Sequence, residues 1–299
     1  MNDFQQQLTQ SSPESRQEWT GKFTSRLAIV LIGGLVGTIL IFLTVKGVAL
    51  FTDNGVSVWR FLSQTDWQPG HHHFGALPMI VTSFGVTLLA GAFSLPLALV
   101  VAVAITEILP GKVKLVFQPL IELLVGIPSV VYGYLGLTTI VPALQRLFGG
   151  TGFGILAATG VLFLMILPTM TSMTIDSLRA VPQKYRQASA GLGATRWQTI
   201  SRVVIPSARS GILTAAVFGM ARAFGEALAV QMVIGNTTVM PTGLVESAAT
   251  LTSVLTTGIG NTVMGTAENN ALWSLALILL LMSLVFNLLI HLASKKGAR

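Results

Sequence analysis

Residues 211–235 read GILTAAVFGMARAFGEALAVQMVIG, an apolar run interrupted by one arginine and one glutamate. The run is long enough to cross a bilayer as an α-helix, which needs about 20 apolar residues. Arg222 and Glu226 are four positions apart, so on a continuous helix they share one face within pairing distance. A charged side chain at the bilayer centre costs at least about 2.5 kcal/mol, and such residues usually line a pathway or pair with each other. We therefore predict that these two side chains handle a polar or charged solute inside a membrane.

The composition of the whole chain indicates a membrane protein. Of its 299 residues, 52% are hydrophobic and only 10% are charged, whereas soluble domains carry about 25% charged residues. The net charge of +7 does not indicate nucleic-acid binding, because the basic residues are distributed by membrane side rather than along one surface. The absence of cysteine excludes a disulfide framework, a thiol nucleophile and a thiolate metal site.

Six apolar stretches are long enough to span a bilayer as helices. They run over Leu27–Leu50, Leu77–Ile105, Leu115–Val141, Phe153–Ile175, Gly211–Ile234 and Ala271–Leu292. The second and third contain Pro96 and Pro128, so we expect kinks or tilt there. The sequence thus predicts an all-α polytopic membrane protein with six transmembrane helices, which form one permease domain over residues 25–294.

Lysine and arginine are concentrated in alternate connections between these stretches. The N-terminal tail, the turn after the second span, the segment after the fourth span and the C-terminal tail hold most of them. By the positive-inside rule we expect both termini in the cytoplasm. Residues 1–24 are predicted to be a disordered cytoplasmic tail, because the first twenty residues are polar and rich in Gln and Ser, and residues 295–299 form a short basic tail.

The basic segment after the fourth span predicts two short helices outside the membrane. The first is expected over Gln183–Ala190, after Pro182, because proline suits the first turn of a helix. Gly193 is expected to break the helical pattern. Thr195 is the expected N-cap of the second helix, and Pro206 is expected to stop that helix. From local physics alone, this pair either forms a compact knob or lies along anionic lipid as an interfacial amphipathic pair.

The same segment resembles the signature loop of bacterial ABC-importer permeases. The resemblance is carried by Gln187-Ala188-Ser189, then Gly193, then Val203-Val204-Ile205-Pro206. In that family the loop opens Glu-Ala-Ala, keeps the glycine and closes with Ile-x-Leu-Pro. The resemblance implies that residues 177–209 form a coupling loop, which docks into a groove on an ATPase subunit. Gln187 and Ser189 depart from the pattern, so the resemblance implies docking by shape without the family's carboxylate.

Three stretches together resemble the permease pair of the phosphate-specific importer. They are residues 126–137 (GIPSVVYGYLGL), 191–212 (GLGATRWQTISRVVIPSARSGI) and 222–236 (RAFGEALAVQMVIGN), and the ending MVIGN favours the C-type permease. The resemblance implies a type I permease fold in the bacterial cytoplasmic membrane. It further implies a second homologous permease, two ATPase subunits, an external phosphate-binding protein and inorganic phosphate as the substrate. It assigns Arg222 and Glu226 to phosphate translocation.

The chemistry of these residues agrees with that assignment. Arginine stays charged and its planar fork fits phosphate oxygens bidentately. We expect Glu226 to compensate Arg222 in an empty pathway and to accept a hydrogen bond from a protonated phosphate oxygen. The alternative is a permanent structural pair, because buried pairs also serve packing specificity. Glu122 in the third span either faces the pathway or lies near the cytoplasmic headgroups, since sequence does not fix the depth of one helix.

Enzymatic activity is not expected of this chain. It contains no G-x-x-x-x-G-K-[ST] loop, no H-E-x-x-H and no G-x-S-x-G motif, so ATP hydrolysis is expected on a separate ATPase chain, and no cofactor or metal is expected. The alternatives are a related sulfate or molybdate importer and an ATPase-independent secondary transporter. His71–His73 are interpreted as a plain loop. Gly243–Leu255 has helical spacing and is a candidate surface for the binding protein, while Phe51–Phe74 carries no prediction.

Overall fold

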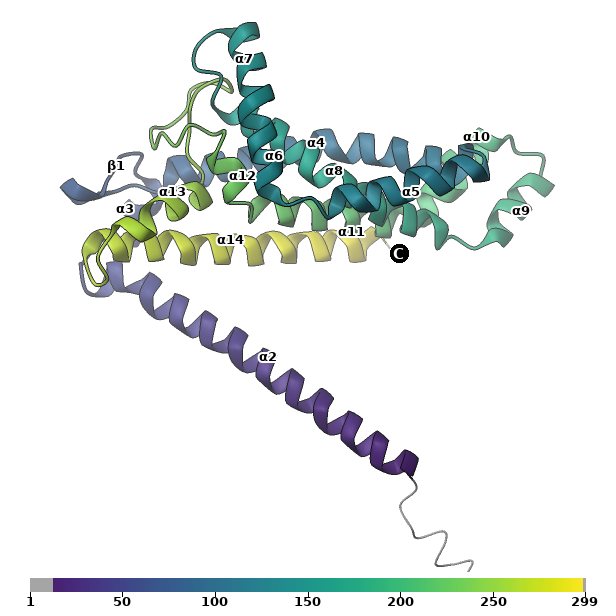
Figure 1. The fold of residues 1–299 in the computed structure, drawn as a ribbon, viewed down its shortest axis with the longest axis horizontal. Coiled ribbons are helices and arrows are strands. Elements are labelled where there is room, and N and C mark those ends of the chain that lie inside the picture. Colours follow the sequence, from purple (N-terminus) through teal and green to yellow (C-terminus); the bar gives the residue numbers. More distant parts are fainter. Residues whose placement is uncertain (1–12, 298–299) are drawn as a thin grey trace, which may run out of the picture.

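The computed structural model describes residues 13–297, which fold into helices joined mostly by short connections (Figure 1). In chain order the elements are α2 (Pro13–Thr52), α3 (Val58–Ser63), β1 (Trp67–Gln68), the 3-10 turn η1 (Pro69–His71), β2 (His73–Phe74), α4 (Leu77–Val103), the π-helical turn η2 (Ala104–Ile108), α5 (Gly111–Val125), α6 (Ser129–Leu135), the π-helical turn η3 (Gly136–Ile140), α7 (Val141–Phe148), α8 (Ile155–Arg179), α9 (Gln183–Gly191), α10 (Arg196–Thr199), the π-helical turn η4 (Ile200–Val204), α11 (Ile205–Phe224), α12 (Leu228–Gln231), α13 (Leu251–Gly258), the 3-10 turn η5 (Ile259–Asn261) and α14 (Ala267–Gly297).

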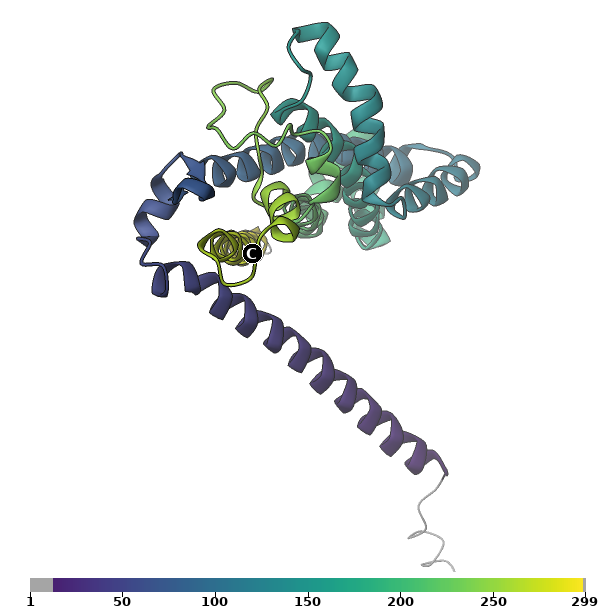
Figure 2. The same cartoon turned by 60° about the vertical axis from the view of Figure 1, so that its left-hand side comes forward.

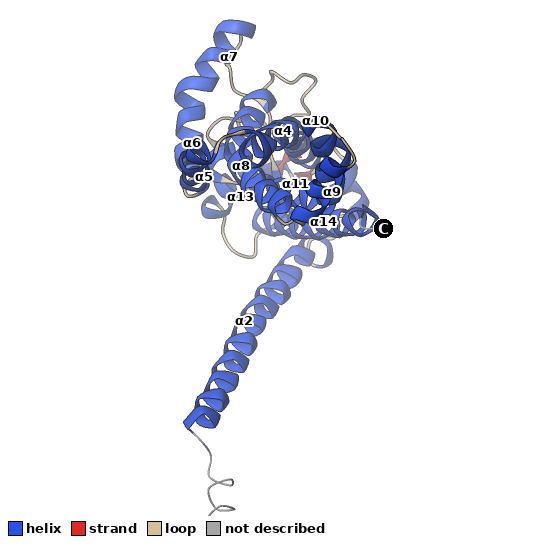
Figure 3. Cartoon of the chain, turned by 90° about the vertical axis from the view of Figure 1, so that its right-hand side faces the viewer, coloured by secondary structure: helices blue, strands red, loops and turns tan. Residues whose placement is uncertain are grey.

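Four long helices, α4, α8, α11 and α14, run side by side and form the body of the molecule (Figures 1 and 3). α4 packs on α8, α8 on α11 and α11 on α14. Glycines permit close approach between them: a Cβ on Gly219 would lie 2.5 Å from Met170, and one on Gly91 would lie 2.6 Å from Met220. Such small-residue contacts are typical of helix packing in membranes.

Five helices within residues 13–297 are long and apolar enough to cross a membrane, and a bent helix pair adds a sixth span if the pair crosses as one unit. The bent pair consists of residues 111–125 and 129–148, with an angle of 93° between them. Pro128 explains the bend, because proline lacks an N–H and drives the preceding residue away from helical dihedrals. The predicted all-α polytopic fold and the interruption at Pro128 are confirmed, while α4 continues through Pro96.

The predicted boundaries of the fifth span are wrong at both ends. One continuous helical segment runs from Arg196 to Phe224, through α10, η4 and α11. Pro206 therefore does not stop a coupling helix, because it lies in the first turn of α11, where a missing N–H is tolerated. The preceding π-helical turn η4 takes up the local distortion. At the other end the helix stops at Phe224, ten residues before the predicted Ile234.

The first helix, α2, leaves the body at a steep angle (Figures 2 and 3). It begins at Pro13, so residues 13–24 are helical rather than disordered, and the prediction for residues 1–12 lies outside the described part of the chain. The last two residues of the basic tail, 298 and 299, also lie outside it. Only the end of α2 packs on α14, where Ser274 Oγ donates to the Gly47 carbonyl at 2.7 Å. None of its most apolar stretch is buried within this chain.

The segment between the first two spans forms a small folded unit at the end of the bundle opposite α9 (Figure 1). Strands β1 and β2 pair antiparallel, with Trp67 opposite Phe74, and the Trp67 ring packs against both Phe74 and the fully buried Phe61. The plain-loop interpretation of residues 71–73 is therefore wrong. His73 lies in β2 and its Nδ1 pairs with Asp66, which precedes β1.

The predicted helical stretch Gly243–Leu255 is displaced toward the C-terminus. Residues 236–250 are irregular, and the helix is α13, Leu251–Gly258. The start is fixed by Thr250, whose side chain accepts from the Ser253 N–H while Ser253 Oγ accepts from the Thr250 N–H. This reciprocal capping box satisfies two donors that a helix start otherwise leaves unpaired.

Candidate functional site

Arg222 and Glu226 lie on either side of a helix break, not on one continuous helix. α11 ends at Phe224, and Gly225 is its C-cap. The Glu226 N–H bonds to the Ala223 carbonyl at 3.2 Å, and the next helix starts only at Leu228. The prediction that spacing alone places both charges on one helix face is therefore wrong. Glycine weakens a helix by about 1 kcal/mol relative to alanine, and here it falls between the two charges.

The guanidinium of Arg222 is held by a neutral partner. Its Nη1 donates to Thr169 Oγ1 on α8 at 2.7 Å, and the Thr169 side chain is buried. Among residues whose side chains the structure describes, 18–288, no carboxylate forms an ion pair with Arg222. Thr169 thus fixes one donor, and the guanidinium keeps further donors for another acceptor.

The carboxylate of Glu226 is likewise held by neutral groups. Its Oε1 accepts from the Ala229 N–H at 3.2 Å, in the first turn of α12, and its backbone carbonyl accepts from Thr252 Oγ1 at 2.9 Å. Glu226 lines a narrow cavity with hydroxyl side chains from α4 and α13, which are Ser83, Thr87, Thr250 and Thr252. A hydrogen bond from the Leu251 N–H to Ser83 Oγ, at 2.9 Å, joins these two helices.

The arrangement leaves two opposite, half-buried charges without mutual neutralisation in the middle of the helical body. A guanidinium with unused donors suits an oxyanion, since charge-assisted bonds to phosphate or carboxylate oxygens are short and strong. A nearby carboxylate with hydroxyl neighbours suits a protonated oxygen of the same ligand. The site therefore has the chemistry of an oxyanion passage.

The third predicted pathway residue, Glu122, is not brought together with the other two. It lies on the exposed face of α5 and accepts from Gln118 Nε2 at 3.0 Å. Gln118 in turn accepts from Arg179 Nη2 at 2.7 Å, at the last turn of α8. Thr169 lies ten residues earlier on α8, which is about 15 Å along a helix. These contacts favour the end of the bundle for Glu122.

The coupling loop, residues 177–209, forms a knob at one end of the bundle (Figure 1). The predicted helix over 183–190 and the Thr195 N-cap are confirmed, and Thr195 Oγ1 accepts from the Gln198 N–H at 3.3 Å. Gly193 adopts φ +79°, the left-handed region that favours glycine. Ser189 is buried and its Oγ lies 2.9 Å from Thr199 Oγ1, which joins α9 to α10.

Other residues of the loop signature face outward, although Val204 is fully buried. Gln187, Ala188 and Pro206 are exposed. Beside them, Leu192 is 89% exposed and Trp197 is 64% exposed. Apolar side chains this exposed on a small basic knob are suited to contact with another surface.

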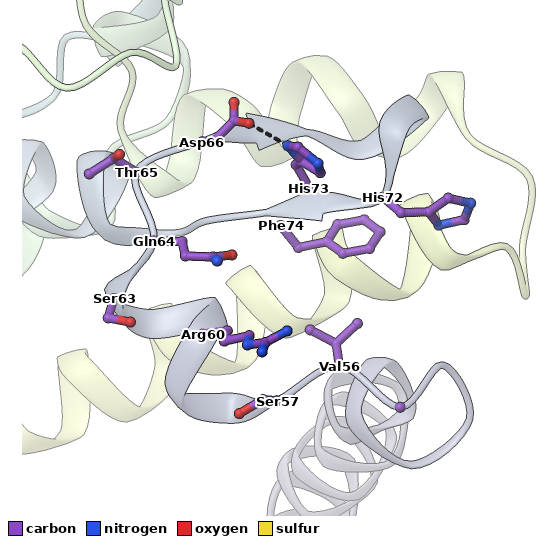
Figure 4. A pocket seen from close by; sticks show the side chains of 11 residues that line it. Val56, Ser57, Arg60, Ser63, Gln64, Thr65, Asp66, His72, His73 and Phe74 are labelled. Carbon is purple, nitrogen blue, oxygen red and sulfur yellow. Dashed lines mark hydrogen bonds and ion pairs between the residues drawn. The ribbon is translucent and has the colours of Figure 1, made fainter.

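A cavity of about 730 Å³ lies away from these residues, in the folded unit between the first two spans. Arg60 of α3 and the Asp66–His73 pair beside the hairpin line different sides of it (Figure 4). Neither Arg222 nor Glu226 contributes to it. Although this cavity is large, we do not assign it as the transport pathway, because the two charged side chains of the bundle lie elsewhere.

Sequence reasoning missed the hydroxyl partners of the site, Thr169, Thr252 and Ser83. Thr169 and Ser83 lie in apolar stretches, Thr252 lies in a segment rich in Ser and Thr, and none of the three belongs to a motif. The available signal is weak: Thr169 follows Pro168 inside the fourth span, and Thr252 follows the capping residue Thr250. It also missed Glu107, a carboxylate at the basic side of the second span, whose partner is Arg186 of the coupling loop.

Membrane-length helices around a half-buried charge site, with a knob at one end, define a multi-pass transport permease. Residues 94–296 match the family described as binding-protein-dependent transport system inner membrane component, and the chain belongs to this family. It has the type I fold of ABC-importer permeases. The family is a membrane-embedded transport component, not a catalytic enzyme.

Several relatives match most of the chain. It is 49% identical to the probable ABC transporter permease protein YqgH of Bacillus subtilis, over 96% of this chain and 94% of that protein. It is 32% identical to the phosphate transport system permease protein PstC of Mesorhizobium japonicum, over 92% of this chain and 90% of that protein. PstC of Haemophilus influenzae is 29% identical to it, over 91% of this chain and 92% of that protein.

Solved structures support the fold. The chain is similar to a subunit of a bacterial alginate ABC transporter, with a TM-score of 0.67 and 13% identity over 96% of this chain and 97% of that one. It is also similar to a chain of the inward-facing MetNI methionine ABC transporter, with a TM-score of 0.58 and 19% identity over 75% and 98%. At these identities the likeness concerns the fold alone.

Proposed function

We propose that this chain is the C-type permease subunit of an ATP-driven importer of inorganic phosphate. The observation that carries the proposal is the Arg222 guanidinium, half-buried in the bundle, anchored by the Thr169 hydroxyl and not neutralised by a carboxylate. A dianion that offers several oxygens is the complementary ligand. Two PstC proteins among the relatives, named for phosphate transport, support phosphate over other oxyanions.

The proposal includes a second permease that packs against α2. The most apolar stretch of α2 has a mean hydropathy of 2.7 and is 0% buried within the chain. A helix this apolar belongs in lipid or against another membrane helix. A homologous permease subunit, related to this chain by pseudo-symmetry, supplies such a helix surface.

The proposal also includes an ATPase on the coupling loop and a phosphate-binding protein at the opposite end. The loop exposes Leu192 and Trp197, and its basic residues place it in the cytoplasm by the positive-inside rule, together with both termini. The unit between the first two spans then lies outside, at the other end of the bundle (Figure 1). ATP-driven closure of two ATPase subunits moves the loop and switches the access of the site.

The test is uptake of radiolabelled phosphate by cells that lack their own high-affinity permease and carry this chain with its partners. Arg222→Ala is expected to reduce uptake by about 100-fold, because truncating a buried charged contact costs about 3 kcal/mol. Arg146→Ala is the matched control, since Arg146 is exposed on α7. Membrane levels of each variant are measured in parallel.

The outcomes distinguish an error in the proposed substrate from an error in the proposed role of Arg222. Uptake that resists excess sulfate and molybdate supports phosphate as the substrate. Normal uptake by Arg222→Ala would leave the arginine with a structural role only. If an assembled complex takes up sulfate or molybdate in place of phosphate, the proposed substrate is wrong, but the assignment of the chain as a permease stands.

A further inference from the structure

An ion pair joins the coupling loop to the end of the second span. Arg186 on α9 donates from Nη2 to Glu107 Oε1 at 2.7 Å and from Nε to Glu107 Oε2 at 3.4 Å. The two side chains are 19% and 13% exposed, so both are largely removed from water. A two-pronged, shielded pair of this kind is stronger and better oriented than a surface salt bridge.

The same guanidinium also satisfies the end of α8. Its Nη1 donates to the Val181 carbonyl at 2.7 Å, and its Nη2 donates to the Leu178 carbonyl at 2.9 Å. Leu178 lies in the last turn of α8 and Val181 just beyond it, so these bonds tie Arg186 to the point where α8 ends. Arg186 therefore fixes three segments against one another: α9, the end of α8 and the end of the second span.

A second arginine of the loop reaches the same place. Arg196 on α10 donates from Nη2 to the Glu107 carbonyl and to the Ile108 carbonyl, the latter at 3.4 Å. Glu107 lies in the π-helical turn η2, which closes with a bond from the Leu109 N–H to the Ala104 carbonyl. π-helical turns are frequent at functional positions. We call Glu107, Arg186 and Arg196 the inner junction.

Tightly packed apolar side chains surround the inner junction. Buried residues from the second span, from the end of α8 and from the loop form one cluster, including Ile105, Leu178, Ile200 and Val204. Of these, Leu178 and Val204 are fully buried. Such close packing is hard to compress. A displacement of the loop therefore moves the neighbouring helix end and does not deform the packed cluster.

The second span connects this junction to the charge site. α4 continues into η2, so one helical segment, residues 77–108, carries Glu107 at its end. Thr87, which lines the cavity beside Glu226, lies twenty residues earlier on the same segment, about 30 Å along a helix. Although the second span is not adjacent to the loop in sequence, the inner junction gives it a direct polar connection to the loop.

We propose that the inner junction transmits movement of the coupling loop to the second span, with Glu107 as the positioning residue that receives it. The inference rests on the proposed docking of this loop on an ATPase. It requires that Arg186 and Arg196 hold Glu107 while the loop moves, so that α4 moves its hydroxyl groups relative to Glu226. Coupling then reaches the site through α4, in addition to the continuous helix from α10 to α11.

The test uses the complete complex reconstituted in lipid, with Glu107→Gln or Arg186→Gln. Each substitution removes one charge and keeps a polar side chain. Arg146→Gln is the matched control, because Arg146 is an exposed arginine on α7, outside the coupling loop. Since the chain has no cysteine, a single Leu88→Cys on α4 reports movement of the second span through its rate of maleimide labelling, with and without nucleotide. ATP hydrolysis is measured on the same samples.

We expect the nucleotide-driven change in labelling to fall by about ten-fold in both junction variants, while ATP hydrolysis per assembled complex is retained. Arg146→Gln should behave as the unsubstituted chain. Three results would overturn the proposal: an unchanged labelling response in either junction variant, a parallel loss of hydrolysis and response in proportion to assembly, or no nucleotide response in the unsubstituted chain. The labelling does not require phosphate, so a wrong substrate would leave this test intact.

Discussion

Two arginines of this chain, Arg186 and Arg222, are held in opposite ways. All three guanidinium nitrogens of Arg186 donate within the chain, to the Glu107 carboxylate and to two carbonyls. Arg222 donates to one hydroxyl, that of Thr169, and no carboxylate in the described part of the chain pairs with it. A guanidinium whose donors and charge are satisfied stabilises structure, whereas one that keeps both available can bind a ligand. In the proposed mechanism, the difference separates a mechanical junction from a transport site.

The comparison predicts, first, that the junction contributes more to stability than the exposed carboxylates do. Glu107→Ala should lower the free energy of unfolding by about 2 kcal/mol, because it leaves the Arg186 charge shielded and without its carboxylate partner. Thermal unfolding of the purified chain in detergent measures the effect. Glu122→Ala serves as the control, since Glu122 is exposed and bonds to Gln118 alone. Equal decreases in the free energy of unfolding for the two variants would contradict the larger contribution of the junction to stability.

The second prediction concerns the hydroxyl that anchors Arg222. Thr169→Val keeps the side-chain volume and removes the acceptor of the 2.7 Å bond from Arg222 Nη1. The guanidinium then loses its fixed orientation, and phosphate uptake at low substrate concentration should fall by about ten-fold. Thr214→Val is a matched control, because Thr214 bonds only to the Ser210 carbonyl on its own helix. Unchanged uptake by Thr169→Val would mean that Arg222 needs no anchor.

The third prediction tests the helix break that separates the two charges. A Cβ on Gly225 meets no heavy atom closer than 3.8 Å, and its φ is −85°, so alanine fits there without strain. Alanine favours helix over glycine by about 1 kcal/mol, so Gly225→Ala should raise thermal stability slightly. It should also lower uptake about five-fold, because an extended α11 redirects Glu226. Full uptake would show that the break is dispensable.

The smallest predicted effect lies outside the membrane, at another carboxylate held by neutral donors. The Thr242 N–H and hydroxyl, with a further bond from the Gly243 N–H, hold the pKa of Glu246 below its usual range. Because the folded pKa is lowered, this stabilisation is complete above the ordinary glutamate pKa and is lost as pH falls through the lowered value. At neutral pH, Glu246→Gln should speed hydrogen exchange at Thr242 and Gly243 about three-fold and leave uptake unchanged. Unaltered exchange would contradict the capping role.

The sequence predicts the helices better than it predicts the junctions between them. Hydropathy identifies the spans because it depends on composition, and the apolar run 211–235 satisfies it throughout. The backbone nevertheless breaks at Gly225, since hydropathy does not register the low helix propensity of glycine. Pro206 shows the reverse error, because a residue that usually stops helices here lies within a continuous helical segment, directly after the π-helical turn η4.

The candidate site was predicted by residue type and not by geometry. Arg222 and Glu226 are identifiable because charges are rare in apolar stretches, yet the partner of Arg222, Thr169, lies 53 positions away and is set by tertiary packing. The inner junction was not predicted, because its members Glu107 and Arg186 lie 79 positions apart in sequence. The hairpin at Trp67 was also missed, since two-residue strands are too short to show alternation.

The central claim is that the unneutralised fork of Arg222 binds the transported oxyanion. The most direct measurement is phosphate uptake by the reconstituted complex with Arg222→Lys, compared with the unsubstituted chain at equal assembly and equal ATP hydrolysis. Lysine keeps the positive charge and loses the planar fork, so uptake at low phosphate should fall by at least about ten-fold. Uptake equal to that of the unsubstituted chain would mean that charge alone suffices, and would contradict recognition by the guanidinium fork.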